Sequence, residues 1–541
     1  MNLKNKISAV FPTEEQIPTQ YNLESPLLQN EYLVNGDIKV YDGEFKDVYS
    51  PICVNENGEL KQKYLGRYPM MSENDALAAL EAAKNAYDNG RGEWPTMSVE
   101  ERIACVSDFT FKMLEKRDEV VKLLMWEIGK SATDSEKEFD RTVKYIQDTI
   151  DALKELDRDS SHLKISEGVI AQIRRAPLGV TLCMGPFNYP LNETFTLLLP
   201  ALIMGNTVVF KPPKFGVLLH RPFLEAFRDS FPRGVINTIY GSGRETITPV
   251  MQSGDVSILA FIGGSKAASK LKHLHPKPHR LRSVLGLEAK NAGIVLPDAD
   301  LELAVAECLM GSLSFNGQRC TALKILFVHE NIIGSFVEIF KKKIANIKIG
   351  MPWEKSVSIT PLPEDGKIEY LNELIEDAKS KGANIINEHG GETNKTFMFP
   401  AVLFPVSKDM RIYHEEQFGP LVPIVSFKDI KAPLEYVNDS NYGQQVSVFG
   451  NNADTIAKLI DPLVNQVARV NINSQCQRGP DTFPFTGRKD SAEGTLSVYD
   501  ALRSFSMRGL VAVKQSDENK QIITQILKEH KSNFLSTNFI L

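Results

Sequence analysis

One cysteine stands where its thiol could act as a nucleophile. Cys320 lies in Ser-Phe-Asn-Gly-Gln-Arg-Cys-Thr, residues 314–321, between a predicted helix and a predicted strand. The adjacent arginine and the nearby glycine favour an exposed thiolate that a substrate can approach. The alternative is an inert buried thiol, because a free cysteine usually packs as a small hydrophobe. Cys476 is the nearest competitor, since Cys183 and Cys308 lie in apolar segments.

Two further side chains could assist such a nucleophile. Asn188 lies in Pro-Phe-Asn-Tyr-Pro, residues 186–190, which connects a predicted strand to a predicted helix. Its amide could donate to a carbonyl oxygen that becomes charged, as in an oxyanion hole, or it could cap the helix that follows. Glu288 is a lone acid between apolar segments, and it could act as a general base or pair with Lys290. The local sequence leaves both alternatives open.

Two lysines follow a predicted strand in Thr-Val-Val-Phe-Lys-Pro-Pro-Lys, residues 207–214. Nucleotides bind where the strands of an open parallel sheet end, and the ammonium groups of Lys211 and Lys214 would suit ribose and phosphate oxygens. Equally, both could be solvated loop lysines. The usual Gly-x-Gly-x-x-Gly motif is absent, because Gly-Ser-Gly at 241–243 and Gly-Gly-Ser at 263–265 are both too short. Any dinucleotide must therefore be held in a non-standard way.

The composition is that of a soluble, multidomain globular protein. The 541 residues include 62 Lys or Arg and 68 Asp or Glu, a formal net charge of −6, with 42% hydrophobic residues. This mildly acidic balance argues against a nucleic-acid or membrane partner. The most apolar stretch, residues 195–204, is too short to span a membrane, and the N-terminus lacks the apolar core of a secretory signal. We expect a cytoplasmic protein, and the six scattered cysteines predict no metal site.

The spacing of apolar residues predicts an α/β fold. Helical spacing at 72–88, 100–116 and 119–129 predicts that the first 150 residues are largely helical. Beyond residue 178, short apolar runs alternate with helical segments, which predicts two open parallel sheets with a boundary near Gly286. The predicted strands are 178–184, 207–211, 235–240, 256–262, 292–296, 324–328, 421–427 and 445–450, and the predicted helices are 191–204, 217–231, 301–313 and 331–347. Residues 166–175 alternate as in a protruding hairpin.

Taken together, four motifs identify a family resemblance. They are Pro-Phe-Asn-Tyr-Pro (186–190), Lys-Pro-Pro (211–213), Phe-Asn-Gly-Gln-Arg-Cys-Thr (315–321) and Glu-Glu-Gln-Phe-Gly-Pro (415–420). In their order and in the order of strands and helices, the chain resembles the aldehyde dehydrogenase superfamily from about residue 174 to 503. It is most similar to the non-phosphorylating, NADP-dependent glyceraldehyde-3-phosphate dehydrogenases.

The resemblance implies an aldehyde dehydrogenase-like α/β fold with two open parallel-sheet domains and a small β oligomerisation arm. The NADP-binding domain would comprise residues 1–157 and 177–286, and the catalytic domain residues 287–488. Residues 158–176 and 489–541 would form the arm and a C-terminal extension. The chain would assemble into a homodimer or homotetramer.

The same resemblance implies a reaction. Cys320 would attack an aldehyde, and the Asn188 amide with the Cys320 backbone N–H would stabilise the oxyanion. Hydride would pass to NADP, and water would hydrolyse the thioester to the acid. The implied preferred substrate is D-glyceraldehyde 3-phosphate, a phosphorylated aldehyde, which would give 3-phosphoglycerate.

Five residues match the family's cofactor site. Lys211 matches the ligand of the adenosine ribose, Gly263 the glycine beneath the pyrophosphate, and Glu416 with Phe418 the nicotinamide-ribose end. Lys214 falls where many NAD-dependent members carry a glutamate, and a lysine there would attract a 2′-phosphate and favour NADP, with use of NAD left open.

Four residues match the subfamily's ligands for the substrate phosphate. These are Arg319, Arg478 and Arg141 together with Tyr189. Three guanidinium groups converging near a thiol would fit a dianionic phosphate better than an alkyl aldehyde.

The sequence departs from the family at the general base. Alignment on Lys290 places Gly286 where the family has its glutamate, and Glu288 follows two residues later. Residues two apart in an extended segment face the same side, so Glu288 could reach the same water. Otherwise the chain could be an acylating enzyme that passes the acyl group to coenzyme A, or a catalytically silent fold-mate with a binding role.

Overall fold

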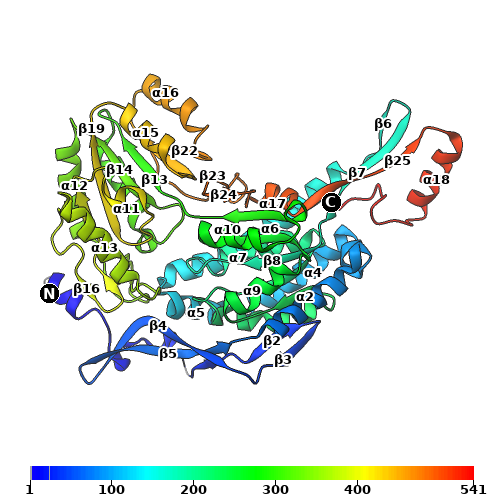
Figure 1. The fold of residues 1–541 in the computed structure, drawn as a ribbon, viewed down its shortest axis with the longest axis horizontal. Helices are drawn as coiled ribbons and strands as arrows, with labels where there is room; N and C mark the ends of the chain where they lie inside the picture. Colours follow the sequence, from blue (N-terminus) through cyan, green and yellow to red (C-terminus); the bar gives the residue numbers. More distant parts are fainter. Residues whose placement is uncertain (1–2, 24, 541) are drawn as a thin grey trace.

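Two parallel sheets form the body of the protein, whose computed structural model describes residues 3–23 and 25–540 (Figure 1). The first sheet has the order β10-β9-β8-β11-β12-β24, and all its strands are parallel except β24. Its strands are β8 (Val180–Met184), β9 (Thr207–Lys211), β10 (Ile236–Thr238), β11 (Val256–Ile262), β12 (Arg282–Gly286) and β24 (Ala492–Glu493). Every residue of β8 is buried, as expected for a central parallel strand covered by helices.

The second sheet has the order β15-β18-β19-β14-β13-β21-β22, with only β15 antiparallel. Its strands are β13 (Asn291–Val295), β14 (Leu323–His329), β15 (Asn384–Ile385), β18 (Ala401–Phe404), β19 (Leu421–Phe427), β21 (Gln445–Phe449) and β22 (Arg469–Ile472). A short connection, residues 287–290, leads from β12, the last parallel strand of the first sheet, to β13 of the second. The predicted α/β class with two parallel sheets is confirmed.

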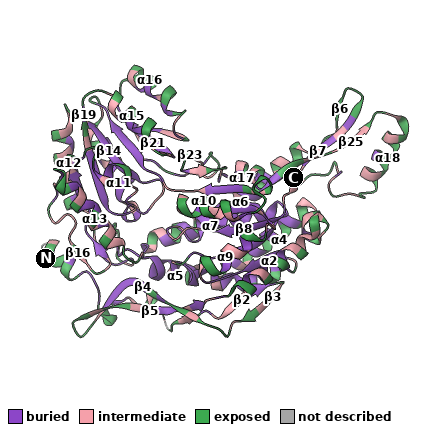
Figure 2. Ribbon diagram, in the orientation of Figure 1, coloured by how far each residue is buried: buried purple, intermediate pink, exposed green. Residues whose placement is uncertain are grey.

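Helices cover both sheets, and six of the thirteen named here lie within two residues of a predicted range. The helices beside the first sheet are α2 (Glu73–Tyr87), α4 (Val99–Leu114), α5 (Arg117–Ile128), α6 (Ala132–Asp159), α7 (Asn192–Ile203), α8 (Leu224–Ser230), α9 (Gly243–Gln252) and α10 (Ser265–Leu274). Those beside the second are α11 (Leu301–Leu313), α12 (Ile333–Ala345), α13 (Lys367–Ser380), α15 (Lys431–Asp439) and α16 (Ala453–Leu463). Figure 2 shows that the buried residues gather in the sheets and on the helix faces turned toward them.

The prediction of a largely helical N-terminal region is wrong for residues 27–69. This region forms β1 (Leu27–Leu28), β2 (Glu31–Val34), β3 (Asp37–Val40), β4 (Phe45–Glu56) and β5 (Glu59–Pro69). The overlooked signals are two Asn-Gly pairs, at 35–36 and 57–58, whose φ angles are 52° and 75° in the first and 53° and 92° in the second. Positive φ at both central residues is what a two-residue hairpin turn requires, and Asn-Gly is the pair that adopts it most readily.

Three antiparallel strands project from the body and form what we call the arm (Figure 1). They are β6 (Lys164–Ser166), β7 (Val169–Pro177) and β25 (Ser506–Lys514), followed by α18 (Asp517–Lys528). The predicted hairpin is therefore confirmed. Residues 489–505, which the resemblance places in the arm and C-terminal extension, lie instead in the body, because β24 joins the first sheet and α17 (Val498–Ser504) packs on α6 and α7. A two-residue strand is too short to show an alternating pattern.

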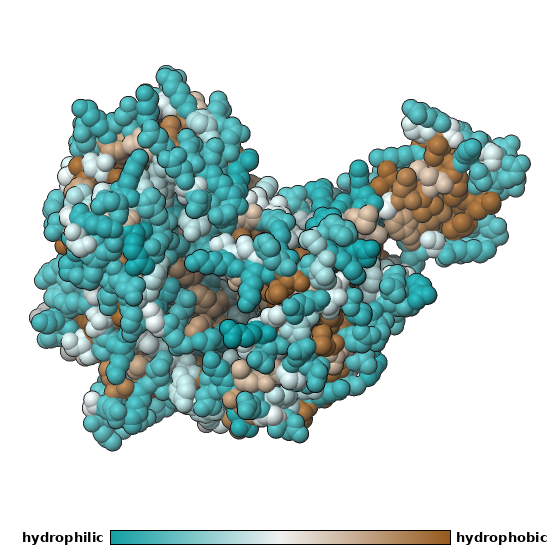
Figure 3. Space-filling model, in the orientation of Figure 1, coloured by the Kyte–Doolittle hydropathy of each residue, from teal (hydrophilic) through white to brown (hydrophobic). Residues whose placement is uncertain are grey.

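Large apolar side chains are exposed on the arm. Ile165 is 65% exposed, Met507 52% and Leu510 62%. Figure 3 shows the hydrophobic surface that gathers there.

None of the helices within residues 3–23 and 25–540 is both long and apolar enough to cross a membrane.

Close contact between β8 and α7 fixes the loop that joins them. A Cβ added at Gly185 would overlap the Thr194 hydroxyl and would lie 2.9 Å from the Thr194 Cα. We expect Gly185→Ala to lower the free energy of unfolding by about 1–3 kcal/mol, because overpacking forces the helix away from the strand. Urea unfolding checks this, with Gly243→Ala as control, since nothing lies within 4 Å of a Cβ there. Equal unfolding midpoints for the two variants would contradict the prediction.

Candidate active site

A cavity of about 990 Å³ opens between the two sheets. One wall comes from the segments that follow β8, β11 and β12, where parallel strands end. The other wall comes from Cys320, just before β14, and from residues 415–418, before β19. Ligands of open α/β sheets bind outside the carboxyl ends of the strands, so this cavity is the candidate active site.

The cavity brings together seven of the twelve predicted site residues: Asn188, Lys214, Gly263, Glu288, Cys320, Glu416 and Phe418. The other five lie outside its lining: Arg141, Tyr189, Lys211, Arg319 and Arg478. The predicted nucleophile, oxyanion donor and acid therefore share one space, whereas the predicted phosphate ligands lie behind its wall.

Cys320 lies in the turn between the 3-10 helix η6 (Ser314–Gly317) and β14. Burial raises the pKa of its thiol, and the negative charge of Glu193 raises it further. Lys324 and Arg478 act in the opposite direction. The competing thiol of Cys476 is fully buried, with its pKa raised to about 11 by burial. Cys320 is therefore the cysteine that the cavity presents to a substrate.

Asn188 contacts the turn that carries the cysteine. Its Nδ2 donates to the Gln318 carbonyl at 2.8 Å, and within the described part of the chain it donates to no other acceptor. The remaining N–H of this amide is thus available to an oxyanion. The alternative interpretation of Asn188 as a helix cap is wrong, because Glu138 accepts the backbone N–H groups of Leu191 and Asn192 at 3.0 and 3.1 Å.

A buried ion pair that the sequence analysis missed supports this loop. Lys130 and Glu138 are bonded to each other with both side chains fully buried. Lys130 also donates to the Asn188 carbonyl at 2.8 Å and lies 3.6 Å from the ring centroid of Tyr189 and 4.4 Å from that of Phe315. Burial lowers the pKa of Lys130, which Glu138 opposes. The one ammonium therefore joins the Asn188 loop to the segment that precedes Cys320.

The carboxylate of Glu288 lies at the start of α10, where its Oε2 accepts the Ser265 backbone N–H at 2.7 Å. It does not pair with Lys290, which donates to Gln417 Oε1 at 2.6 Å. At Gly286, where the family has its glutamate, an added Cβ would lie 3.2 Å from a side-chain carbon of Ile262. The acid of this chain is therefore held at the start of α10, two residues after β12 ends.

The lysines at the end of β9 have different surroundings. Burial lowers the pKa of Lys211 to about 8. Lys214 is half-exposed and forms an ion pair with Asp365 at 2.7 Å. Lys214 lines the cavity, whereas Lys211 lies outside its lining.

Across the cavity, Glu416 pairs with Lys324 at 2.8 Å and accepts the Ala289 backbone N–H at 3.1 Å. Lys324 is a second residue that the sequence analysis missed, although a lysine within the apolar strand β14 was a signal. The ring of Phe418 lies 5.8 Å from that of Phe187, and Gly263 N–H donates to the Gly286 carbonyl at 3.0 Å. These contacts fix the walls on both sides.

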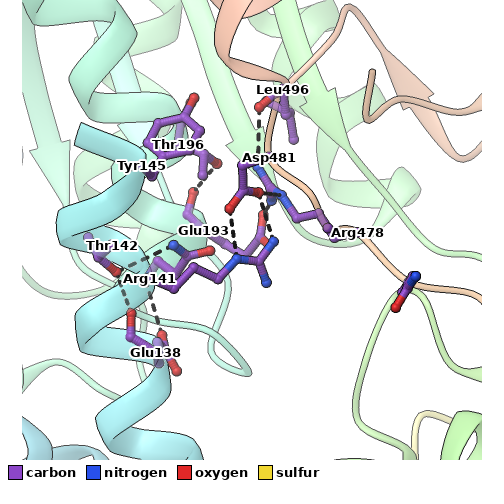
Figure 4. Close-up of polar contacts among 12 residues, drawn as sticks. Glu138, Arg141, Thr142, Tyr145, Glu193, Thr196, Arg478, Asp481 and Leu496 are labelled. Atoms are coloured by element: carbon purple, nitrogen blue, oxygen red, sulfur yellow. Dashed lines mark hydrogen bonds and ion pairs between the residues drawn. The ribbon is translucent and has the colours of Figure 1, made fainter. Parts of the chain in front are cut away.

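Two of the three predicted arginines meet, but their charges are compensated (Figure 4). Arg141 binds both oxygens of Asp481, at 2.7 and 2.8 Å. Arg478 donates to Asp481 at 3.1 Å and also bonds Glu193. Arg319 instead donates to the Gly311 carbonyl at 3.0 Å. The expected convergence of three guanidinium groups is therefore not observed.

The comparisons with known proteins agree with this geometry. The model of the aldehyde dehydrogenase family matches residues 54–509. The chain belongs to the aldehyde dehydrogenase family. This confirms the predicted family and, with the fold, the predicted architecture. Among residues 3–23 and 25–540, no group of three or more His, Cys, Asp or Glu side chains is placed to hold a metal ion.

Several relatives share most of their length with this chain. The NADP-dependent glyceraldehyde-3-phosphate dehydrogenase of Streptococcus equinus is 32% identical over 494 residues, which are 90% of this chain and 98% of that protein. The 3-sulfolactaldehyde dehydrogenase of Priestia aryabhattai is 29% identical over 78% of this chain and 87% of that one. The crystal structure of the NADP-dependent glyceraldehyde-3-phosphate dehydrogenase of Bacillus halodurans, complexed with NADP, has a TM-score of 0.82 at 29% identity and covers 91% of this chain and all of that one.

The raised pKa of Cys320 predicts how its reactivity depends on pH. Only the thiolate reacts, so the rate of alkylation by iodoacetamide without cofactor should keep rising above pH 9, the usual thiol range. Mass spectrometry of the Cys320 peptide gives the rate, and Cys320→Ser is the control. A plateau below pH 8 would contradict the prediction. Full alkylation with activity retained would exclude Cys320 as the nucleophile.

Proposed function

We propose that the protein oxidises an aldehyde to its carboxylic acid with NADP, through a thioester on Cys320. The observation that carries this proposal is the single cavity that Cys320, Asn188 and Glu288 share with four of the five predicted cofactor residues, Lys214, Gly263, Glu416 and Phe418. A binding or structural protein would need no such combination of nucleophile, donor and acid. A catalytically silent fold-mate is therefore disfavoured.

Different side chains carry out the successive steps of the proposed reaction. The Cys320 thiolate attacks the aldehyde carbon, and the oxyanion accepts hydrogen bonds from the free Asn188 amide N–H and the Cys320 backbone N–H. Loss of hydride from the same carbon leaves a thioester, and bound NADP supplies the acceptor for that hydride. Glu288 then takes a proton from the water that releases the acid. For this step its carboxylate must leave the Ser265 N–H.

The residues of the first sheet fit a dinucleotide. The Ser265 N–H at the start of α10 donates to the carboxylate of Glu288, and a helix N-terminus of this kind suits the oxygens of a pyrophosphate. Lys211, whose pKa is lowered to about 8 by burial, would bind the ribose, and Lys214 would bind a 2′-phosphate. In this proposal residues 1–157 and 177–286 form the cofactor domain and residues 287–488 the catalytic domain.

The proposed substrate is D-glyceraldehyde 3-phosphate, which gives 3-phosphoglycerate. Support comes from the relatives named for this aldehyde, at up to 32% identity over nine-tenths of the chain. We further propose that two or four copies assemble through the arm, because its exposed Ile165, Met507 and Leu510 would be buried against another subunit.

One observation favours a second function. Gly286 provides no acid, and the carboxylate of Glu288 is bound at α10. If Glu288 cannot reach the thioester, a thiol acceptor must replace water. The chain would then be an acylating dehydrogenase that transfers the acyl group to coenzyme A.

Initial rates separate these functions. The formation of reduced nicotinamide is followed with D-glyceraldehyde 3-phosphate in phosphate-free buffer, with NADP or NAD, and with or without coenzyme A. We expect turnover with NADP and no requirement for coenzyme A. A rate seen only with coenzyme A would assign the acylating reaction, and no rate with any aldehyde would contradict both.

The position of Lys214 predicts its effect on the choice of cofactor. Lys214→Ala should raise the KM for NADP roughly tenfold, because a charge-assisted contact to the 2′-phosphate is lost, and should leave the KM for NAD nearly unchanged. Asp365→Asn is the control, since it frees Lys214 and should lower the KM for NADP. Equal effects on both cofactors would remove Lys214 from 2′-phosphate recognition.

A further inference from the structure

Glu193 occupies an unexpected position for a carboxylate. It lies in the first turn of α7, five residues after Asn188, and it lines the same cavity as Cys320. Because both residues line this cavity, the carboxylate lies at the space in which an aldehyde must react, and its negative charge raises the pKa of the Cys320 thiol. Neither the reaction nor the proposed cofactor site uses it.

The ion pairs around Glu193 form a closed cluster that consists of Arg141, Glu193, Arg478 and Asp481 (Figure 4). Arg478 bonds both acids, and Arg141 binds Asp481 through two hydrogen bonds. Two guanidinium groups therefore face two carboxylates, and the cluster has no net charge.

All three side-chain nitrogens of Arg478 already donate a hydrogen bond, which leaves two of its five N–H groups for a ligand. Its three nitrogens donate to Glu193, Asp481 and the Leu496 carbonyl, the last at 3.2 Å. Its side chain is buried, and its guanidinium lies 4.6 Å from the ring centroid of Phe485. Because Glu193 lines the cavity and Arg478 does not, an incoming anion meets the carboxylate first.

We propose that Glu193 is a specificity-determining residue that competes with the substrate's anionic tail for Arg478. This inference rests on the proposed aldehyde oxidation. A phosphate dianion must displace the carboxylate or bind beside it, which costs affinity, whereas an uncharged hydroxylated tail meets no such repulsion. The protein therefore oxidises unphosphorylated short hydroxyaldehydes as well as phosphorylated ones, and Glu193 keeps the kcat/KM values for the two kinds of substrate comparable.

Glu193→Gln tests this with little change of shape. The amide oxygen can still accept a hydrogen bond from Arg478, but the cluster gains one positive charge. We expect the ratio of kcat/KM for D-glyceraldehyde 3-phosphate to that for D-glyceraldehyde to rise roughly tenfold or more, mainly through the KM of the phosphorylated substrate. If Glu193 only holds Arg478 in place, the isosteric amide leaves this ratio unchanged, which would overturn the proposal.

The matched control is Glu364→Gln. Glu364 lines the same cavity and pairs with Lys367 at 2.9 Å, so its replacement adds the same charge away from the cluster. We expect the substrate ratio of this variant to stay at the wild-type value. A rise equal to that of Glu193→Gln would mean that overall cavity charge, and not competition for Arg478, sets the preference.

A binding measurement separates this inference from the proposed function. Glycerol 3-phosphate has the tail but no aldehyde, and glycerol is its uncharged counterpart. By calorimetry, Glu193→Gln should bind glycerol 3-phosphate about tenfold more tightly than the wild type, with no gain for glycerol. Such a gain without turnover of any aldehyde would defeat the proposed function and leave the role of Glu193 supported. An unchanged affinity in a folded variant would overturn that role even if the enzyme is active.

Discussion

The buried ammonium of Lys130 is the contact on which the arrangement of the site depends. A charge removed from water is costly unless other groups compensate it, and here Glu138, the Asn188 carbonyl and two aromatic rings do so. Loss of one partner from such a pair typically costs about 3–5 kcal/mol. Since Glu138 also caps α7, the same pair sets the direction of the helix that carries Glu193.

Further contacts connect Lys130 to the cysteine, and a second lysine anchors the opposite wall of the cavity. Lys130 donates to the Asn188 carbonyl, and the side-chain amide of Asn188 donates to the Gln318 carbonyl. These two bonds fix the turn that carries Cys320. On the other wall, Lys324 holds Glu416 and donates to the Cys320 carbonyl at 2.9 Å. The thiol therefore lies between two anchored elements, one from each sheet, and the chain passes between those sheets at residues 287–290 and returns at residues 473–491.

Local pattern predicted the repeating elements well and the connections poorly. The strands at 207–211, 256–262 and 421–427 and the helix at 301–313 have the predicted ends, because their apolar runs are bounded by turns or caps. The β4–β5 hairpin was missed because helical spacing was extended over a region whose Asn-Gly turns indicate strands. The order of motifs located the cavity residues.

Ion pairs between residues far apart in the chain could not be predicted from local sequence patterns. Arg478 and Glu193 are 285 residues apart, and nothing near either residue indicates that they meet. The resemblance supplied the arginines but not their counter-charges. Likewise, Glu288 could be identified as an acid at the right wall, whereas its bond to Ser265 depends on how α10 approaches residue 288.

The closed charge cluster also constrains how this chain can diverge. Arg478 is shared by Glu193 and Asp481, so a substitution of any one of these three residues leaves a buried cluster whose charges no longer balance. Effects of changes within such a network are not additive, and the order in which they arise decides whether each intermediate folds. A switch of substrate in this lineage would therefore pass through coupled replacements, in which the carboxylate changes to a polar isostere before either arginine is lost.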